Sequence, residues 1–269
     1  IAEVETVRNV LKKSVLHKRI IGVDIYYDKM IENDIEEFKK CLINNSFQDI
    51  KRVGKWLIFE LDNYYLLSHL RMEGKYFIKD TSEEKAKHEH VIIHFEDKTD
   101  LRYHDTRKFG RMKIVPKSEL CDTEEIKKQG FEPGSKELTG EYLLAKFKSK
   151  KEAIKTALLD QTIISGLGNI YADEVLFASG IYPERRADSI TLDEANKIVN
   201  ASARIIKKAM EMGGTTIRSY TSSLGVTGHY QDYLCVHKKE NCPCMTCGTP
   251  ITRIKVGGRS TYYCSECQK

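Results

Sequence analysis

The sequence predicts an α+β protein of two domains, because strand-like and helix-like segments occupy different parts of the chain. Short apolar stretches separated by turn residues fill residues 1–115 without alternating helices, which favours a sandwich or barrel of strands. Helical periodicity dominates residues 137–234, and cysteines concentrate in residues 235–269. We therefore expect an N-terminal β-sandwich with a flanking helix, a polar linker over residues 116–136, and a C-terminal helical domain ending in a cysteine-rich ribbon.

The composition is that of a globular chain with a mild positive charge. Its 269 residues are 31% charged and 41% hydrophobic, enough for one large core or two modest ones. No apolar run approaches the length of a membrane span, and no signal peptide opens the sequence, so we expect a cytoplasmic, or at least non-secreted, protein. The net charge of +5 excludes little, but basic residues cluster at 146–155 and recur at 253–259, as in nucleic-acid-binding proteins.

The first half opens with a helix and continues as strands. Val4, Val7 and Leu11 lie on one helical face and predict a helix over residues 3–13. A series of β-forming segments bounded by turn residues follows. These segments are Ile20–Tyr27, Trp56–Leu61, Tyr64–Leu70, Lys75–Ile78, His90–Phe95, Leu101–His104 and Arg111–Val115.

The second half contains a long helix with recognisable ends. Thr191 and Glu194 form a plausible capping box, and the helix should continue through Met212 to a stop at Gly213-Gly214. Residues 213–230 are rich in Gly, Ser and Thr and predict a mobile surface loop, which by residue types alone needs no special task.

A glycine-rich turn lies near the middle of the chain, in the stretch Asp160–Leu176. We expect two short helical pieces meeting at Gly166-Leu167-Gly168-Asn169, with a helix stop at Gly180. An ordinary helical hairpin explains such a turn. The nearby cluster of lysines, together with the cysteine-rich tail, favours instead a helix N-terminus whose amides bind phosphate.

The C-terminal cysteines have the spacing of a zinc ribbon over residues 235–269. Two Cys-x-x-Cys pairs, separated by 16 residues, predict one four-thiolate zinc ion. Its ligands are Cys244, Cys247, Cys264 and Cys267. Four thiolates leave no open position for water, so the metal should be structural. Disulfides are the alternative, but they fit poorly with a non-secreted chain. Cys242 has the wrong gap for a ligand pair and is left out.

Several motifs in order resemble one family. Residues 155–185, which contain GLGNIYADEVLFASGIYPER, resemble the helix-two-turn-helix segment of bacterial formamidopyrimidine-DNA glycosylases. The resemblance extends from AEVETVR at the start to GGRSTYYCSECQK at the end. It implies a bifunctional glycosylase and AP lyase of base-excision repair, which excises 8-oxoguanine and formamidopyrimidines from double-stranded DNA. It further implies a monomer in the bacterial cytoplasm, associated with the nucleoid, and a 213–230 loop that closes over an extruded base.

The resemblance assigns a DNA wedge to two turns of the sheet domain. Met72, Arg107 and Phe109 would enter the space left by the extruded base, with Arg107 facing the orphaned partner base. An isolated Met or Phe is more often a core residue, but these lie in turn-like segments beside Arg and Gly. The family usually has proline where Thr106 stands, a change we expect to be harmless.

The same residue matching implies a set of DNA contacts. Lys155 is a candidate contact to the lesion. Any one of the basic residues in this set, taken alone, is accounted for as an ordinary solvated charge on the surface. Only the residues together predict an affinity for DNA that falls as salt rises. The implied phosphate contacts are Lys55, His88 or His90, Lys150, Asn169 and Arg259.

Catalytic roles also follow from the resemblance. Family members begin, after the initiator Met, with Pro-Glu, whose proline amine attacks the sugar C1′ while the glutamate acts as acid. A terminal amine suits this task because it titrates near 8, against about 10.4 for lysine. Neither this proline nor this glutamate precedes Ile1 in the sequence. Three explanations are open: the two native residues are omitted from the sequence, they are non-standard residues, or the chain is truncated and inactive. We favour the first two because AEVETVR is otherwise intact.

The remaining catalytic-site residues implied by the family are four. Lys55 would position a phosphate and assist proton transfer, and Arg259 would assist δ-elimination. Glu174 would orient the nucleophile, and Glu3 matches a family glutamate other than the missing acid.

Two rival functions remain open. An endonuclease VIII-like enzyme shares the helix-two-turn-helix and the ribbon but prefers oxidised pyrimidines. The EVETVR opening and the long 213–230 loop favour the purine enzyme. The second rival is a zinc-ribbon nucleic-acid binder without catalysis. The chain also departs from the family at His237 and Lys238, where relatives carry tyrosine and glycine.

Overall fold

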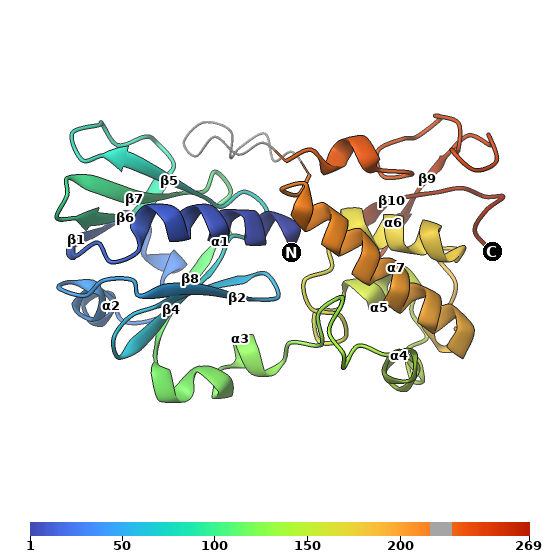
Figure 1. The fold of residues 1–269 in the computed structure, drawn as a ribbon, viewed down its shortest axis with the longest axis horizontal. Helices are drawn as coiled ribbons and strands as arrows, with labels where there is room; N and C mark the ends of the chain where they lie inside the picture. Colours follow the sequence, from blue (N-terminus) through green and yellow to red (C-terminus); the bar gives the residue numbers. More distant parts are fainter. Residues whose placement is uncertain (216–227) are drawn as a thin grey trace. The chain divides into compact units, whose positions relative to one another are not determined.

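The computed structural model describes residues 1–215 and 228–269 and divides the chain into two compact units (Figure 1). The sheet unit contains residues 2–127 with Thr215 and Gly228, and the helical unit contains Ile1, residues 128–214 and residues 229–269. Most of the loop predicted at 213–230 lies outside the described residues.

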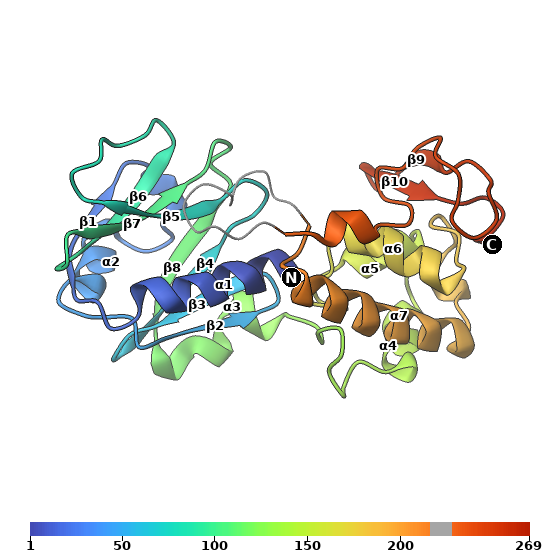
Figure 2. The ribbon, with the colours of Figure 1, turned by 45° about the horizontal axis from the view of Figure 1, so that its top comes forward.

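The sheet unit is a sandwich of two four-stranded antiparallel sheets, in the orders β1-β6-β7-β5 and β2-β3-β4-β8. Helix α1 runs along β2 and β3 (Figure 2). The predicted α+β class and the sandwich with its flanking helix are confirmed. The helices of this unit are α1 (Ala2–Val15), η1 (Asp28–Met30), α2 (Ile35–Leu42), η2 (Lys117–Asp122) and α3 (Glu124–Lys127). Its strands are β1 (Ile20–Ile25), β2 (Asp49–Val53), β3 (Trp56–Glu60), β4 (Tyr64–His69), β5 (Lys75–Asp80), β6 (Glu89–Phe95), β7 (Thr99–His104) and β8 (Arg111–Pro116).

The sequence pattern missed strand β2 and helix α2 of the sheet unit, and it also missed the short helices η1, η2 and α3, the last two of which lie within the predicted 116–136 linker. Strand β2 carries Asp49, Lys51 and Arg52, so only Ile50 of its five residues is buried and no apolar alternation marks it. It is an edge strand, paired with β3 alone. Helix α2 is short, and it starts at Asp34, whose carboxylate caps the backbone N–H groups of Glu36 and Glu37.

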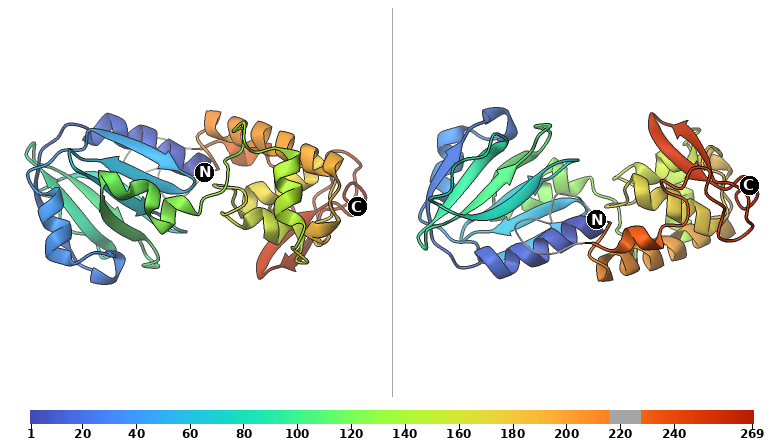
Figure 3. Two further views of the ribbon diagram at one scale, coloured as in Figure 1. Left: turned by 90° about the horizontal axis from the view of Figure 1, so that it is seen from below. Right: turned by 90° about the horizontal axis from the view of Figure 1, so that it is seen from above.

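The helical unit packs α7 against α4 and α6, and the hairpin β9–β10 lies against α6 (Figure 3). The capping box at Thr191 and Glu194 is present. Helix α6 ends at Gly180, whose φ of 71° lies in the left-handed region that favours glycine. The elements are α4 (Gly140–Phe147), α5 (Ile154–Leu159), α6 (Asn169–Ser179), η3 (Ala187–Ser189), α7 (Leu192–Glu211), η4 (Tyr230–Tyr233), β9 (Thr252–Val256) and β10 (Arg259–Tyr263).

The turn before α6 begins earlier than predicted. Helix α5 ends at Leu159, and residues 160–168 form the connection to α6. The prediction of a first helical piece that begins at Asp160 is therefore wrong. The Asp160 carboxylate accepts hydrogen bonds from the backbone N–H and hydroxyl of Thr162 at 2.9 and 2.7 Å, which favours a turn over a continued helix. The helix start at Asn169 is confirmed.

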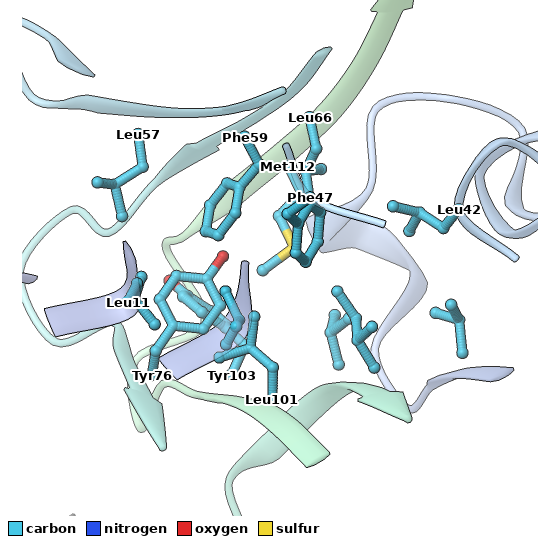
Figure 4. Packing of buried hydrophobic residues seen from close by; sticks show 14 of the residues in the cluster. Leu11, Leu42, Phe47, Leu57, Phe59, Leu66, Tyr76, Leu101, Tyr103 and Met112 are labelled. Carbon is cyan, nitrogen blue, oxygen red and sulfur yellow. The ribbon is translucent and has the colours of Figure 1, made fainter. Parts of the chain in front are cut away.

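One apolar core fills the space between the two sheets (Figure 4). Leu11 of α1, Phe59 of β3 and Tyr103 of β7 are almost fully buried in it. Phe47 and Phe59 lie with ring centroids 4.9 Å apart, a favourable aromatic geometry. The predicted helical face of Val4, Val7 and Leu11 is confirmed as the buried face of α1. In the described part of the chain, no helix is long and apolar enough to cross a bilayer.

A buried charge network covers the opposite face of the β1-β6-β7-β5 sheet. Arg102 and Asp100, both almost fully buried, form an ion pair at 2.8 Å. His94 lies between two carboxylates, with Nδ1 2.7 Å from Asp100 and Nε2 3.1 Å from Asp24. Burial alone would lower the pKa of His94, but the hydrogen bonds with Asp100 and Asp24 outweigh burial and raise that pKa above its ordinary 6.5.

This raised pKa predicts a pH-dependent stability of the sheet unit. The native state binds the proton of His94 more tightly than the unfolded chain, so the stabilisation is complete below pH 6.5 and is lost as pH rises through the raised pKa. Thermal unfolding should therefore separate the wild type from His94→Gln more widely at pH 5.5 than at pH 8.5. His229→Gln, which changes an exposed histidine, is the control. An equal separation at both pH values would contradict the assignment.

Candidate nucleic-acid interface and metal site

The four predicted zinc ligands lie together in the helical unit. The sulfurs of Cys244, Cys247, Cys264 and Cys267 are all within 4.8 Å of one another, and all four thiols are free. The Cys244–Cys267 and Cys247–Cys264 sulfur separations are 3.9 and 3.4 Å. Tetrahedral zinc with Zn–S bonds of about 2.3 Å requires separations of about 3.8 Å. The four residues therefore fit one structural zinc ion, and Cys242 is outside the group.

The hairpin β9–β10 connects the two ligand pairs and presents Arg259. Its tip is formed by Gly257 and Gly258, whose φ values of 53° and 78° favour glycine. Arg259 is the first residue of β10 and is exposed. The carbonyl of Ser260 accepts a hydrogen bond from Asn169 Nδ2 at 3.0 Å, so the start of α6 holds the hairpin directly behind Arg259.

Lys155 is enclosed within the protein. Its side chain is fully buried, and its ammonium lies 2.7 Å from Asp173. Burial lowers the pKa of Lys155, and the charge of Asp173 opposes that shift. The predicted contact between Lys155 and a lesion would require this ion pair to open. Lys150 lies at the surface and pairs with Asp160 at 3.0 Å and Glu152 at 3.4 Å.

Glu174 organises the segment that leads into the ribbon. Its two carboxylate oxygens accept the backbone N–H groups of Cys235, Val236 and His237 at 2.7, 3.0 and 2.9 Å. The carboxylate is almost fully buried, so these three bonds replace its hydration. The side chain therefore acts on the backbone of residues 235–237.

In the sheet unit, the residues predicted to form the wedge meet at two turns. Met72 is 71% exposed and Phe109 46% exposed, which separates both from the core. The Arg107 guanidinium donates to Met72 Sδ at 3.2 Å and lies 4.6 Å from the Phe109 ring centroid. The three side chains thus form one exposed cluster of apolar surface with a positive charge.

The turn that carries Arg107 and Phe109 is built around Asp105, a residue that the motif analysis did not single out. The buried carboxylate of Asp105 accepts the backbone N–H groups of Arg107, Phe109 and Gly110 at 2.9, 2.9 and 2.8 Å. A Cβ on Gly110 would lie 1.9 Å from the Tyr103 hydroxyl, so only glycine fits there. An Asp that opens a Gly-containing turn was the available signal.

The histidines of this region differ in exposure. His90 is buried, its Nε2 lies 2.9 Å from the Asp105 carbonyl, and burial lowers its pKa. His88 is partly exposed, with its ring centroid 6.3 Å from that of His90. Burial, with the charges of Arg71 and Lys55 nearby, lowers the pKa of His69 to about 3. Its neutral Nδ1 accepts the Arg71 N–H at 2.9 Å.

Two further predicted residues also have defined places in the sheet unit. Lys55 is in the turn between β2 and β3, where Gly54 has a φ of 58°. Glu3, in the first turn of α1, accepts the backbone N–H and hydroxyl of Thr215 at 3.2 and 2.9 Å. Glu3 therefore holds the described start of the 213–230 loop.

Comparisons with known proteins agree with this architecture. Residues 1–112 match the formamidopyrimidine-DNA glycosylase N-terminal domain, residues 129–221 match its H2TH domain, and residues 243–269 match the zinc finger found in FPG and IleRS. Formamidopyrimidine-DNA glycosylases of Listeria innocua and Ligilactobacillus salivarius are each 46% identical over 99% of this chain and 98% and 97% of theirs.

Solved structures give the same result. A complex between the Lactococcus lactis Fpg and DNA containing an abasic site is similar with a TM-score of 0.95 and 38% identity, covering 100% of this chain and 99% of that one. A complex of the wild-type L. lactis Fpg with DNA containing N7-benzyl-Fapy-dG has a TM-score of 0.94 and 38% identity, covering 100% and 98%.

The sandwich, the helix-two-turn-helix and the four-thiolate finger together define a base-excision-repair DNA glycosylase of the zinc-finger class. Within that class, the chain belongs to the formamidopyrimidine-DNA glycosylase family.

The metal site predicts a selective effect of cysteine substitution. Cys264→Ser removes one of four thiolates, so the zinc content should fall from about one ion per chain to a small fraction. Elemental analysis of the purified protein measures this ratio. Cys242→Ser is the matched control and should retain the metal, because Cys242 is outside the cluster. Zinc loss in both variants, or in neither, would contradict the ligand set.

Proposed function

We propose that this protein excises oxidised purines, namely 8-oxoguanine and formamidopyrimidines, from double-stranded DNA and then cuts the strand as an AP lyase. The carrying observation is the exposed cluster of Met72, Arg107 and Phe109, of which Arg107 and Phe109 lie on a turn that the buried Asp105 carboxylate organises. Family membership supports the same reaction. The protein acts as a monomer in the bacterial cytoplasm, where it associates with the nucleoid.

The wedge explains how the enzyme reaches a base inside a duplex. Extruding a nucleotide costs a few kcal/mol of stacking and pairing energy. Met72 and Phe109 fill the vacated space with apolar surface, and the Arg107 guanidinium offers hydrogen bonds to the orphaned partner base. Because Asp105 already binds the turn's amides, little conformational entropy is lost when the wedge enters the DNA.

Phosphate contacts come from both units. In the sheet unit, Lys55 and the partly exposed His88 are the better candidates, because His90 is buried on the Asp105 carbonyl. In the helical unit, Arg259 at the hairpin, Lys150 and the amides that begin α6 at Asn169 contribute positive potential. Binding should weaken as salt rises, because these contacts release counterions from the DNA.

The chemistry requires the family's Pro-Glu ahead of Ile1. The terminal amine attacks C1′ and forms an imine as the base leaves, and β- then δ-elimination cut the strand on both sides. Lys55 positions a phosphate and assists proton transfer, and Arg259 assists δ-elimination. Glu174 supports the nucleophile indirectly, since its oxygens hold residues 235–237, and Glu3 anchors the start of the 213–230 loop.

Covalent trapping tests the reaction. With borohydride and an 8-oxoguanine duplex, protein carrying Pro-Glu ahead of Ile1 should form a stable protein–DNA adduct, because the reductant converts the imine to an amine. The chain beginning at Ile1 is the control. A thymine glycol duplex tests the endonuclease VIII-like alternative. No adduct from the longer chain, or preference for thymine glycol, would overturn the proposal.

Substitution in the wedge tests base extrusion. Met72→Ala should lower kcat/KM on 8-oxoguanine duplex by about 5- to 150-fold, the effect of losing about 1–3 kcal/mol of contact with the base stack. Binding to a duplex that already contains an abasic analogue should fall less. Ile21→Ala removes another exposed apolar side chain of the same unit and is the control. An equal loss in both variants would refute the wedge.

A further inference from the structure

Three ionisable side chains form a buried cluster behind the zinc hairpin. Lys155 and Asp173 are fully buried and His237 is 6% exposed. Asp173 lies between the other two, with Oδ1 2.7 Å from Lys155 Nζ and Oδ2 2.6 Å from His237 Nδ1. We propose that Asp173 is a positioning residue that sets the DNA-binding geometry of Arg259 through Lys155. This inference rests on the proposed contact between Arg259 and DNA.

Lys155 connects the Asp173 carboxylate to the hairpin backbone. Its ammonium donates to the Ser260 carbonyl at 3.1 Å and to the buried Thr261 hydroxyl at 2.7 Å. The Asp173 carboxylate, 2.7 Å away, supplies the opposite charge, so two hydrogen bonds and one ion pair hold the ammonium. Lys155 is therefore a structural cation, and the two residues it holds directly follow Arg259 along β10.

Asp173 keeps this cation charged and in place. Burial lowers the pKa of Lys155, and the Asp173 charge and hydrogen bond oppose the shift. Without the carboxylate, the buried amine would lose its proton or move toward water. Either change weakens the bonds to Ser260 and Thr261 and frees the start of β10.

The second oxygen of Asp173 holds the segment beside the hairpin. The Nδ1–H of His237 donates to this oxygen, and its ring lies edge-on to Tyr262, with centroids 5.0 Å apart. The backbone N–H of His237 is bound by the adjacent carboxylate, Glu174. The charged groups bonded to His237 are thus Asp173 and Glu174 on α6, and Asp173 is shared with Lys155 on α5.

A mutant cycle on DNA affinity tests the proposal. The probe is a duplex with a tetrahydrofuran abasic analogue, and the measurement is its Kd at fixed salt. Asp173→Asn keeps the shape but removes the charge, and should raise Kd at least 10-fold with zinc content unchanged. Asp188→Asn is the matched control, because Asp188 pairs with Arg186 at the surface of the same unit. Asp173→Glu should recover part of the affinity.

Epistasis separates positioning from general destabilisation. If Asp173 acts through Lys155 and Arg259, Asp173→Asn should add less than a twofold loss in a Lys155→Met or an Arg259→Ala background. Full additivity with Arg259→Ala, or zinc loss in Asp173→Asn, would overturn the proposal. If the wild type does not bind the probe, or Arg259→Ala does not weaken binding, the proposed function fails. If the wild type binds the probe and Arg259→Ala weakens binding, but Asp173→Asn binds like the wild type, the proposed function stands and only the positioning role of Asp173 fails.

Discussion

The helical unit depends on two adjacent carboxylates that are buried in the middle of α6. A buried carboxylate is tolerated only when hydrogen bonds and opposite charge replace its hydration. Glu174 meets this demand with three backbone N–H groups of residues 235–237, and Asp173 meets it with Lys155 and His237. Glu174 and Asp173 both bind residues 235–237, which precede the ribbon, and Asp173 also binds Lys155, which donates to the hairpin. Helix α6 therefore helps to fix the positions of both the segment before the ribbon and the hairpin.

The sheet unit uses the same constraint at its exposed turn. Asp105 is fully buried and binds three backbone amides, of Arg107, Phe109 and Gly110, in the turn that carries Arg107 and Phe109. Lys108 in that turn adopts a φ of 58°, a conformation that non-glycine residues rarely take without outside support. Three charge-assisted hydrogen bonds supply such support. The Arg107 and exposed Phe109 side chains are thereby attached to a turn whose backbone is held in place.

Features set by local chemistry could be predicted from the sequence. The capping box at Thr191, the glycine stop at Gly180 and the cysteine spacing each act within a few residues, so the pattern and the structure agree. Strand β2 could not be predicted, since its pairing with β3 comes from tertiary context and its residues are mostly charged. The bounds predicted for the domains and the roles of individual site residues stay predictions.

Lys155 shows why residue type alone is a weak guide to a site. A lysine beside a glycine-rich turn and other basic residues indicates a ligand contact, yet its position on α5 directs the ammonium inward to Asp173. The difference arises from Asp173, which is distant in sequence and whose partner cannot be read from spacing. A buried cation held by two hydrogen bonds and one ion pair stabilises one geometry of the residues around it. The burial of Lys155 therefore depends on tertiary contacts that residue type and local spacing do not encode.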